Sequence, residues 1–481
     1  MQQPNILWIC TDQQRYDTLG CTGNSFVKTP NIDRLASKGV LFENAFSQST
    51  VCTPSRASFL TGRYPRTTRC RQNGQNIPED EVLVTRLLAD HGYGCGLSGK
   101  LHISACHPQA TFAGERRIDD GYHQFHWSHH PENSWPTNEY IQWLQAKGKD
   151  FKPEPIEDCN YVQAGPNAAD HQTTWCAEKA IQFIEANERF SKPWLFSVNM
   201  FDPHHPFDPP IDYLQRYLDR LEDIPLPNYM EGELEDKTYV QRFDHNGAYG
   251  MPKLYPFSKM SANDHRYLTA AYWAMIDLID EQVGRMLDAL ERTGQLDNTI
   301  VIFMSDHGEL LGDHGVYLKG PFFYEPCVHV PLIISYPGRY ASGTRVKDLV
   351  ELVDIAPTLL EAAGLPKYPG MQGKSLGKLL SGEPSGSEKH REDIYCEHYN
   401  ASSKQDGVGG FATMVRTDRY KLAMYHRKGE GELYDLTADP NETVNLWNKP
   451  EAAGVQAEMM IRLCDRMAET VDPLPVRLSG W

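Results

Sequence analysis

The chain has 481 residues, of which 40% are hydrophobic and 23% are charged, and its formal net charge is −17. The length predicts one large domain with an appendage, and the ordinary composition excludes a collagenous, low-complexity or broadly disordered chain. The acidic surplus argues against a nucleic-acid partner, which needs a basic face. The net charge does not exclude a small anionic substrate. Salt screens exposed charges that are more than about 10 Å apart, so a local cluster of cations can bind an anion even on an acidic protein.

The eleven cysteines are odd in number and include no C-x-x-C pair. We therefore expect neither a disulfide framework nor a cysteine-rich zinc site. The apolar run at residues 6–10 follows no basic residue and is too short for a signal peptide, and no stretch approaches the ~20 apolar residues of a membrane span. A cytoplasmic protein without membrane partners is expected. A secreted or periplasmic protein whose leader had been removed would have the same N-terminus.

The first half of the chain alternates short apolar runs with helical patterns. Residues 5–11 are predicted to form a buried strand that ends at Asp12, and a helix with Asn31 as its cap is expected at 30–35. Further helices are expected at 55–60, 83–91 and 171–188, with Gly92 and Gly94 ending the second of these. A strand at 194–200 leads into His204. The segments 105–165 and 205–258 are weakly periodic and are expected to be long loops that shape a site.

The second half contains a long amphipathic helix, predicted over 261–293, whose apolar face comprises Leu268, Tyr272, Met275, Ile279, Val283 and Leu287. A strand at 299–304 ends before Asp306, and a strand at 332–335 and a helix at 354–363 follow. This alternation predicts an α/β fold with a mostly parallel central sheet flanked by helices. Short strands at 411–416, 420–425 and 432–435 and a helix near 451–469 predict a small antiparallel unit. We therefore expect a catalytic α/β domain at 1–375 and a C-terminal α+β subdomain at 376–481.

Two pairs of polar residues, Asp12-Gln13 and Asp306-His307, directly follow predicted strands. Ligands bind at the carboxyl ends of strands in open α/β sheets, and carboxylate, amide and imidazole groups suit a divalent cation. Each pair alone equally fits a helix cap and a structural histidine. Because two such pairs follow two predicted strands, a metal site is an alternative of equal weight to these structural roles.

Cys52 opens the segment Cys52-Thr53-Pro54-Ser55-Arg56. A lone cysteine is usually a small buried hydrophobe, and the segment also fits an ordinary loop-to-helix junction. Arg56, however, lies one helical turn beyond Cys52, and a helix N-terminus can bind an anion. Cleaving a sulfate or phosphate ester needs a nucleophile, cations for the oxygens and an acid for the leaving group. This segment can supply the first two.

Residues 52–63, CTPSRASFLTGR, resemble the signature of the formylglycine-dependent sulfatases at every defined position. The resemblance extends over most of the chain through residues 4–6, 29–36, 99–102, 203–207, 305–308, 319, 432–436 and 439–442. It implies an alkaline phosphatase-like fold with a small C-terminal antiparallel subdomain. The implied activity is metal-dependent hydrolysis of sulfuric esters.

By this resemblance, a formylglycine-generating enzyme oxidises Cys52 to formylglycine, whose hydrated form attacks sulfur and then expels sulfate. Arg56 would hold the nucleophile, Lys100 and Lys319 would bind sulfate oxygens, and Lys319 would also lie near the metal. His102 would hydrogen-bond the formylglycine, and His204 would be the general acid. The remaining implied site residues are the metal ligands Asp12, Gln13, Cys52, Asp306 and His307, and the substrate-lining Asn73.

Two positions depart from the common sulfatase pattern, since many members have Asp at position 13 and Asn at position 307. Gln13 and His307 are variants that also occur in phosphonate monoester and phosphodiester hydrolases with the same nucleophile. Calcium is the expected metal, with manganese or magnesium as alternatives. A histidine and one fewer carboxylate favour manganese or another borderline ion.

The expected substrate is a small anionic ester, a sulfated carbohydrate, and homo-oligomerisation is open. The alternatives are a phosphonate monoester or phosphodiester hydrolase, and a non-catalytic binder of sulfated glycans. A third is a phosphomutase or alkaline phosphatase relative that uses Thr53 or Ser55, although the signature favours Cys52 as the nucleophile.

Overall fold

The computed structural model describes residues 3–107, 109–111, 114–131, 137–382, 389–400 and 410–479. Its centre is an eight-stranded sheet in the order β11-β2-β10-β9-β1-β8-β4-β5. Within it, β10 alone runs against the other strands. The strands of this sheet are β1 (Asn5–Thr11), β2 (Val40–Phe42), β4 (Gly94–Gly99), β5 (Gln124–Trp127), β8 (Trp194–Asn199), β9 (Thr299–Ser305), β10 (Leu332–Ser335) and β11 (Thr344–Val346).

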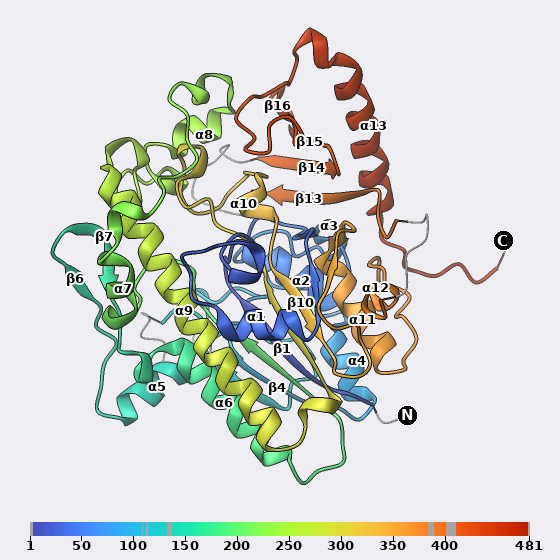
Figure 1. Ribbon diagram of the computed structural model, residues 1–481. Helices are drawn as coiled ribbons and strands as arrows, with labels where there is room; N and C mark the ends of the chain where they lie inside the picture. The colour runs from blue at the N-terminus through green and yellow to red at the C-terminus, as the bar shows by residue number, and fades with distance from the viewer. Residues whose placement is uncertain are drawn as a thin grey trace.

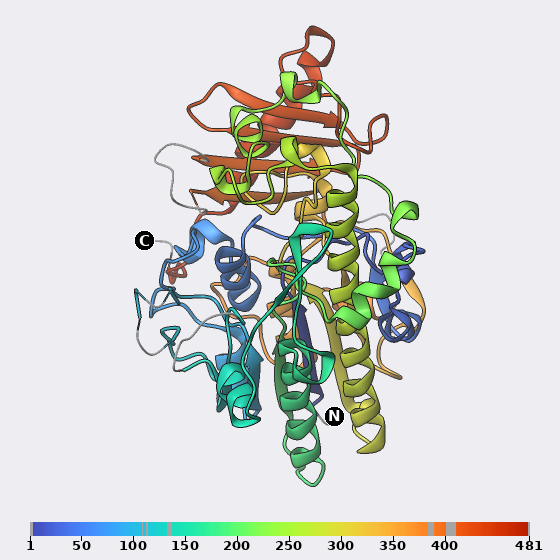
Figure 2. The same ribbon diagram turned by 90° about the vertical axis from the view of Figure 1, so that its left-hand side faces the viewer.

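A second, four-stranded antiparallel sheet forms from the C-terminal part of the chain and lies above the central sheet in Figures 1 and 2. Its strands are β13 (Asp393–Tyr399), β14 (Phe411–Thr417), β15 (Tyr420–Tyr425) and β16 (Glu430–Asp435). Met459 and Leu463 of helix α13 (Ala453–Glu469) pack against Val415 and Leu422 of this sheet. Two short strand pairs complete the sheets, β3 (Ala45–Phe46) with β12 (Val350–Glu351) and β6 (Glu154–Ile156) with β7 (Cys159–Ala164).

Helices cover both faces of the central sheet. One face packs on α1 (Pro30–Ser37), α6 (Gln172–Asn187) and α9 (Ala262–Arg292), and the other on α2 (Cys52–Thr61), α4 (Val84–Asp90) and α11 (Ile355–Ala362). Because strand side chains alternate between faces, Leu7 and Ile9 of β1 join the first core and Ile6 and Trp8 the second. The remaining helices are α3 (Pro65–Thr68), α5 (Glu139–Ala146), α7 (Ile211–Leu218), α8 (Tyr239–Asp244), α10 (Glu325–Val328) and α12 (Gly377–Leu380).

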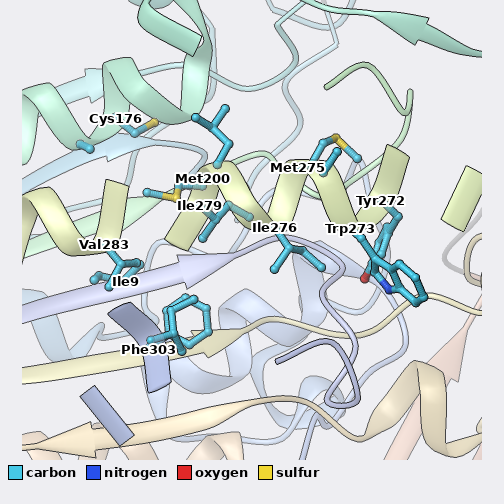
Figure 3. Packing of buried hydrophobic residues seen from close by; sticks show 14 of the residues in the cluster. Ile9, Cys176, Met200, Tyr272, Trp273, Met275, Ile276, Ile279, Val283 and Phe303 are labelled. Atoms are coloured by element: carbon cyan, nitrogen blue, oxygen red, sulfur yellow. The ribbon is translucent and has the colours of Figure 1, made fainter. Parts of the chain in front are cut away.

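The long helix α9 is the main support of the first face. Figure 3 shows Ile276, Ile279 and Val283 on the side of α9 that faces Ile9 of β1 and Phe303 of β9. The helix begins with a capping box, in which the Ser261 hydroxyl accepts from the Asp264 N–H and the Asp264 carboxylate accepts from the Ser261 N–H. Every residue of the predicted apolar face is buried.

The α/β class, the parallel sheet and the C-terminal antiparallel sheet are confirmed. Several local predictions were wrong: Thr29, not Asn31, precedes α1, and Gly94 begins β4 instead of ending a helix. Helix α2 starts at Cys52, three residues before the predicted start, because Pro54 fits a first turn where its missing N–H is not needed. The expected loops at 105–165 and 205–258 contain β5–β7, α5, α7 and α8. The division between residues 375 and 376 stays a prediction.

All eleven cysteines are free thiols, as the sequence indicated. Within the described ranges, no helix is both long and apolar enough to cross a membrane.

Gly99, the last residue of β4, has a φ of +96°, and a Cβ there would lie 1.9 Å from the backbone oxygen of Asn199. We expect Gly99→Ala to lower the free energy of unfolding by about 2–5 kcal/mol, from left-handed strain plus overpacking. Urea denaturation measures this loss. Gly94→Ala, on the same strand with nothing within 4 Å, is the control and should stay within about 1 kcal/mol. Equal losses in both variants would contradict the prediction.

Candidate active site

The site lies where four neighbouring strands end. Strands β9, β1, β8 and β4 are adjacent and parallel, so their carboxyl ends meet at one edge of the sheet. Thr11 pairs with Ser305 at the ends of β1 and β9, which brings the next residues, Asp12 and Asp306, side by side. Lys100 follows β4, and its N–H donates to the Asn199 carbonyl at the end of β8 at 3.0 Å. One edge of the sheet therefore gathers residues from distant parts of the chain.

Cys52 faces this edge from the first turn of α2. Ligand atoms of Cys52, Asp12, Asp306 and His307 all lie within 4.8 Å of one another, and all four side chains are buried. The Cys52 Sγ lies 3.2 Å from His307 Nε2 and 3.6 Å from Asp12 Oδ1. The structure thus joins the two predicted polar pairs with the predicted nucleophile position.

The orientation of His307 suits a metal ligand. Its Nδ1 lies 2.9 Å from the Gly308 carbonyl, which can only accept, so Nδ1 carries the proton. Burial acts to lower the pKa of this ring, but Asp306 and Cys52 raise it above the ordinary value, so a cation would bind Nε2 in place of the second proton. This tautomer leaves a nitrogen ligand beside the two carboxylates.

Gln13 adds an amide oxygen. Its backbone adopts a left-handed φ of 67°, and its Oε1 accepts from the Lys319 ammonium at 2.6 Å. Two carboxylates, one imidazole nitrogen and one amide oxygen form a donor set that fits a divalent cation.

Arg56 holds the two carboxylates together. Its Nε donates to Asp306 Oδ2 at 2.8 Å, its Nη2 to Asp12 Oδ2 at 3.2 Å and its Nη1 to the Lys100 carbonyl at 2.7 Å. All these groups are buried. The guanidinium thereby fixes the ends of three segments in one geometry.

Two lysines converge on the sulfur atom. Lys319 Nζ lies 3.1 Å and Lys100 Nζ 3.5 Å from Cys52 Sγ, and Lys100 also contacts Asp12 Oδ2 at 2.6 Å. Burial alone would raise the pKa of the Cys52 thiol, but Lys100, Lys319 and His307 outweigh burial and the Asp12 charge and hold that pKa below its ordinary value. The pocket therefore stabilises negative charge at position 52.

The carboxylate of Asp12 is also held in its ionised form. Burial acts to raise its pKa, but interactions with its neighbours, Lys100 first and then His204, Arg56 and Lys319, hold that pKa well below the usual range. An ionised carboxylate at physiological pH is the state that a cation would bind.

The two predicted catalytic histidines lie at the same edge in different settings. His204 Nδ1 donates to the His205 carbonyl at 2.5 Å, and burial followed by the charge of Lys319 lowers the His204 pKa well below its usual value. His102 has a left-handed φ of 55°, and its ring packs edge-on against His129 at 4.5 Å. Among the described residues, no hydrogen bond joins either histidine to Cys52.

Asn73 contacts the start of α2. Its Oδ1 accepts from the Thr53 N–H at 2.9 Å, which satisfies a helix N–H that the Val51 cap leaves unpaired. The predicted substrate-lining residue thus also shapes the turn that carries Cys52.

Three further residues that the sequence did not indicate support the site. Glu115 accepts from the N–H groups of His102 at 2.7 Å and Ser104 at 2.9 Å, the Tyr272 hydroxyl donates to the Gln13 carbonyl at 2.6 Å, and Glu309 accepts from the Gln13 amide. The contacts of Tyr272 and Glu309 join residues that are distant in sequence, whereas Glu115 contacts residues that lie 11–13 positions earlier. No local sequence pattern indicates any of these contacts.

Comparison with known proteins agrees with this geometry. A family model described as "Sulfatase" matches residues 4–365, and one for the C-terminal part of N-sulphoglucosamine sulphohydrolase matches residues 312–469. An arylsulfatase of Clostridium perfringens is 32% identical, with 93% of this chain and 91% of the relative covered. An N-acetylglucosamine-6-O-sulfatase of Bacteroides thetaiotaomicron is 29% identical, with 95% and 85% covered. A phosphonate monoester hydrolase of Agrobacterium radiobacter has a TM-score of 0.84 at 26% identity, with 99% and 98% covered.

The sheet, the C-terminal antiparallel unit and the site at the strand ends define a hydrolase of the alkaline phosphatase-like superfamily. Within that superfamily the chain belongs to the sulfatase family, of the type that hydrolyses sulfuric esters.

Removing Arg56 leaves two buried carboxylates without their shared partner. We expect Arg56→Ala to abolish turnover and to lower the free energy of unfolding by about 3–5 kcal/mol, with a folded protein remaining. Hydrolysis of 4-nitrophenyl sulfate measures turnover, urea denaturation measures the free energy of unfolding, and circular dichroism establishes that the variant folds. Arg86→Ala is the control: it removes a partly exposed pair with Asp90 and should cost at most about 1 kcal/mol. A loss as small as the control's would contradict the structural role of Arg56.

Proposed function

We propose that this protein removes sulfate from a sulfated carbohydrate, with formylglycine made from Cys52 as the nucleophile and one divalent cation at Asp12, Gln13, Asp306 and His307. The observation that carries the proposal is the convergence of Lys100 and Lys319 on Cys52 inside an acidic protein. Such a pocket stabilises a nucleophilic oxygen and the charged oxygens of a sulfate group.

The chain's own groups divide the remaining tasks. Lys100 and Lys319 bind sulfate oxygens, and Arg56 bridges the two carboxylates and fixes their separation. A cation bound at the site would supply Lewis acidity toward the nucleophile and the ester; calcium is the first candidate, with manganese or magnesium as alternatives. His204 gives a proton to the leaving oxygen, and the bound anionic ester would raise its pKa from the low value of the free enzyme.

The carbohydrate assignment draws on two supports. One relative is named as an N-acetylglucosamine-6-O-sulfatase. The rings of His204 and His205 are stacked on each other, and His204 is tilted against the buried Phe201, over which Lys100 lies; the partly exposed histidine rings suit the apolar faces of a sugar.

A phosphonate monoester hydrolase is the second candidate, because the fold closely matches an enzyme of that name and Gln13 and His307 replace the more common sulfatase residues. We expect kcat/KM to be at least tenfold higher for 4-nitrophenyl sulfate than for 4-nitrophenyl phenylphosphonate or bis(4-nitrophenyl) phosphate. Steady-state kinetics on protein with confirmed formylglycine measures this ratio. A preference for either phosphorus ester would overturn the sulfatase assignment in favour of the second candidate.

Cys52→Ala should abolish turnover without loss of folding, since it removes the precursor of the nucleophile. Mass spectrometry of the active enzyme should find formylglycine at position 52. Cys70→Ala is the control, because Cys70 is a buried thiol outside the cluster and its loss should leave the chemistry intact. An active Cys52→Ala enzyme would refute the nucleophile. An unmodified Cys52 in inactive protein from the native host would instead favour a glycan-binding role.

The assignment of His204 as general acid predicts a dependence on the leaving group. His204→Gln should lower kcat about 10²–10⁴-fold for a sugar sulfate, whose alkoxide is a poor leaving group, and far less for 4-nitrophenyl sulfate. The measurement is kcat for both substrates in both enzymes. Similar losses for both substrates would assign His204 to binding instead of proton transfer.

A further inference from the structure

Glu309 is a fully buried carboxylate behind the proposed metal site, three residues beyond Asp306. Its Oε1 accepts from the N–H groups of Leu311 at 2.8 Å and Leu318 at 2.5 Å. Its Oε2 accepts from the side-chain amide of Gln13. No lysine or arginine forms an ion pair with Glu309 in the part of the chain that the structure describes. Since a buried charge without an ion pair is costly, the hydrogen bonds that Glu309 accepts must account for its place.

The neighbours of Gln13 fix which end of its amide points where. In its ionised form the Glu309 carboxylate can only accept a hydrogen bond, so it selects the NH₂ end. The Lys319 ammonium can only donate, so it selects the oxygen end, at 2.6 Å. The amide is therefore held from both sides, with its oxygen toward Lys319 and the site.

We propose that Glu309 is a positioning residue that makes the neutral Gln13 side chain a metal ligand, by binding its NH₂ group and turning Oε1 toward the cation. This inference rests on the proposed metal site. Partners of this kind behind a ligand change metal affinity by about 10–100-fold when they are lost. Glu309 also fixes Leu318, the residue before Lys319, so that one carboxylate orients both groups that meet at Gln13 Oε1.

The test is an exchange of the two side-chain types. In Glu309→Gln, the new amide can donate to the Gln13 oxygen and allow the Gln13 amide to flip, and in Gln13→Glu two carboxylates face each other. The double variant Q13E/E309Q restores one amide and one carboxylate with the same total charge. Each single variant should bind Mn²⁺ and Ca²⁺ at least tenfold more weakly than the wild type. The double variant should bind both ions with an affinity within about threefold of the wild-type value.

Titration calorimetry of metal-stripped protein measures these affinities, and urea denaturation establishes that each variant folds. A purely structural Glu309 would lower stability in E309Q without changing metal affinity, and the exchange would not rescue it. A double variant that binds no more tightly than Gln13→Glu overturns the inference, even if Glu309→Gln fails to fold. Wild-type protein that binds neither ion would refute the metal site itself, a separate result.

A different observation concerns Arg71, in the loop whose Asn73 contacts the start of α2. Arg71 lies two residues before Asn73, which contacts Thr53. Its guanidinium stacks over the ring of Tyr399, 4.4 Å from the centroid. The residue before Tyr399, His398, lies 3.0 Å from the Thr50 hydroxyl. The Arg71–Tyr399 pair is thus connected to the chain on both sides of Cys52.

The Nε of Arg71 is buried without a hydrogen-bond partner, and Arg71 makes no ion pair among the described residues. An unsatisfied buried donor of this type is destabilising, and a ligand that accepts a hydrogen bond from it would offset that cost. We infer that Arg71, stacked on Tyr399, binds a second anionic group of the substrate, a carboxylate or a second sulfate on the sugar. This deepens the proposed function and rests on it.

The test compares Arg71→Gln on three substrates: 4-nitrophenyl sulfate, a neutral monosulfated sugar and a sulfated sugar that carries a uronate. The variant should lower kcat/KM for the uronate substrate, mainly through KM, at least tenfold more than for the other two. Arg69→Gln, which removes pairs with the exposed Asp80 and with Glu81, a buried carboxylate that keeps its pair with Arg63, should not produce this difference. Equal effects on all substrates overturn the subsite and leave the sulfatase assignment standing. Turnover of no sulfate ester by the wild type refutes the proposed function itself.

Discussion

The contact on which the site depends is the buried bridge from Arg56 to Asp12 and Asp306. Two carboxylates at the ends of neighbouring strands would repel each other in an interior that water does not reach. The planar guanidinium donates to both and to the Lys100 carbonyl, so one side chain sets the separation of β1, β9 and the segment after β4. Lys100 and Lys319 add two further positive charges. Together with Arg56 they outnumber the two carboxylates, so the surroundings of position 52 are positively charged.

The sheet order explains why so few residues suffice. Because β9, β1, β8 and β4 are adjacent, the first residues after β1, β9 and β4, which are Asp12, Asp306 and Lys100, reach the same edge of the sheet. The nucleophile position enters from a helix on one face, and Gln13 is held by Tyr272 of α9 on the other. The two cores that support the strands therefore also position the chemistry, so that packing mutations in either core should reach the site.

The sequence predicted the parts that local pattern encodes. Apolar runs followed by Asp12 and Asp306 marked strand ends, and parallel strands place such ends at one edge of the sheet. The sequence was therefore sufficient to predict that these two residues lie close together. The antiparallel direction of β10 could not be predicted, because a four-residue apolar run does not indicate whether the strand runs parallel or antiparallel to its neighbours. Glu309, Glu115 and the Asn73 contact were also missed, since each is defined by where its partner folds. Cys52 was identified by resemblance; taken alone it fitted a buried thiol, and only Arg56 and the helix start beside it indicated an anion-binding site.

Charge alone does not separate sulfate esters from phosphonate monoesters or phosphodiesters, because each carries one negative charge. They differ in the third substituent: sulfate offers three non-bridging oxygens, whereas the phosphorus esters offer two and carry a carbon or ester group in the third place. Lys100 and Lys319 both face position 52 from within the buried site. Sulfate can give an oxygen to each ammonium and keep a third for the cation, whereas a phosphorus ester would leave one of these three buried partners facing an uncharged group, at a cost of desolvation. The donor count around Cys52 thus favours sulfur.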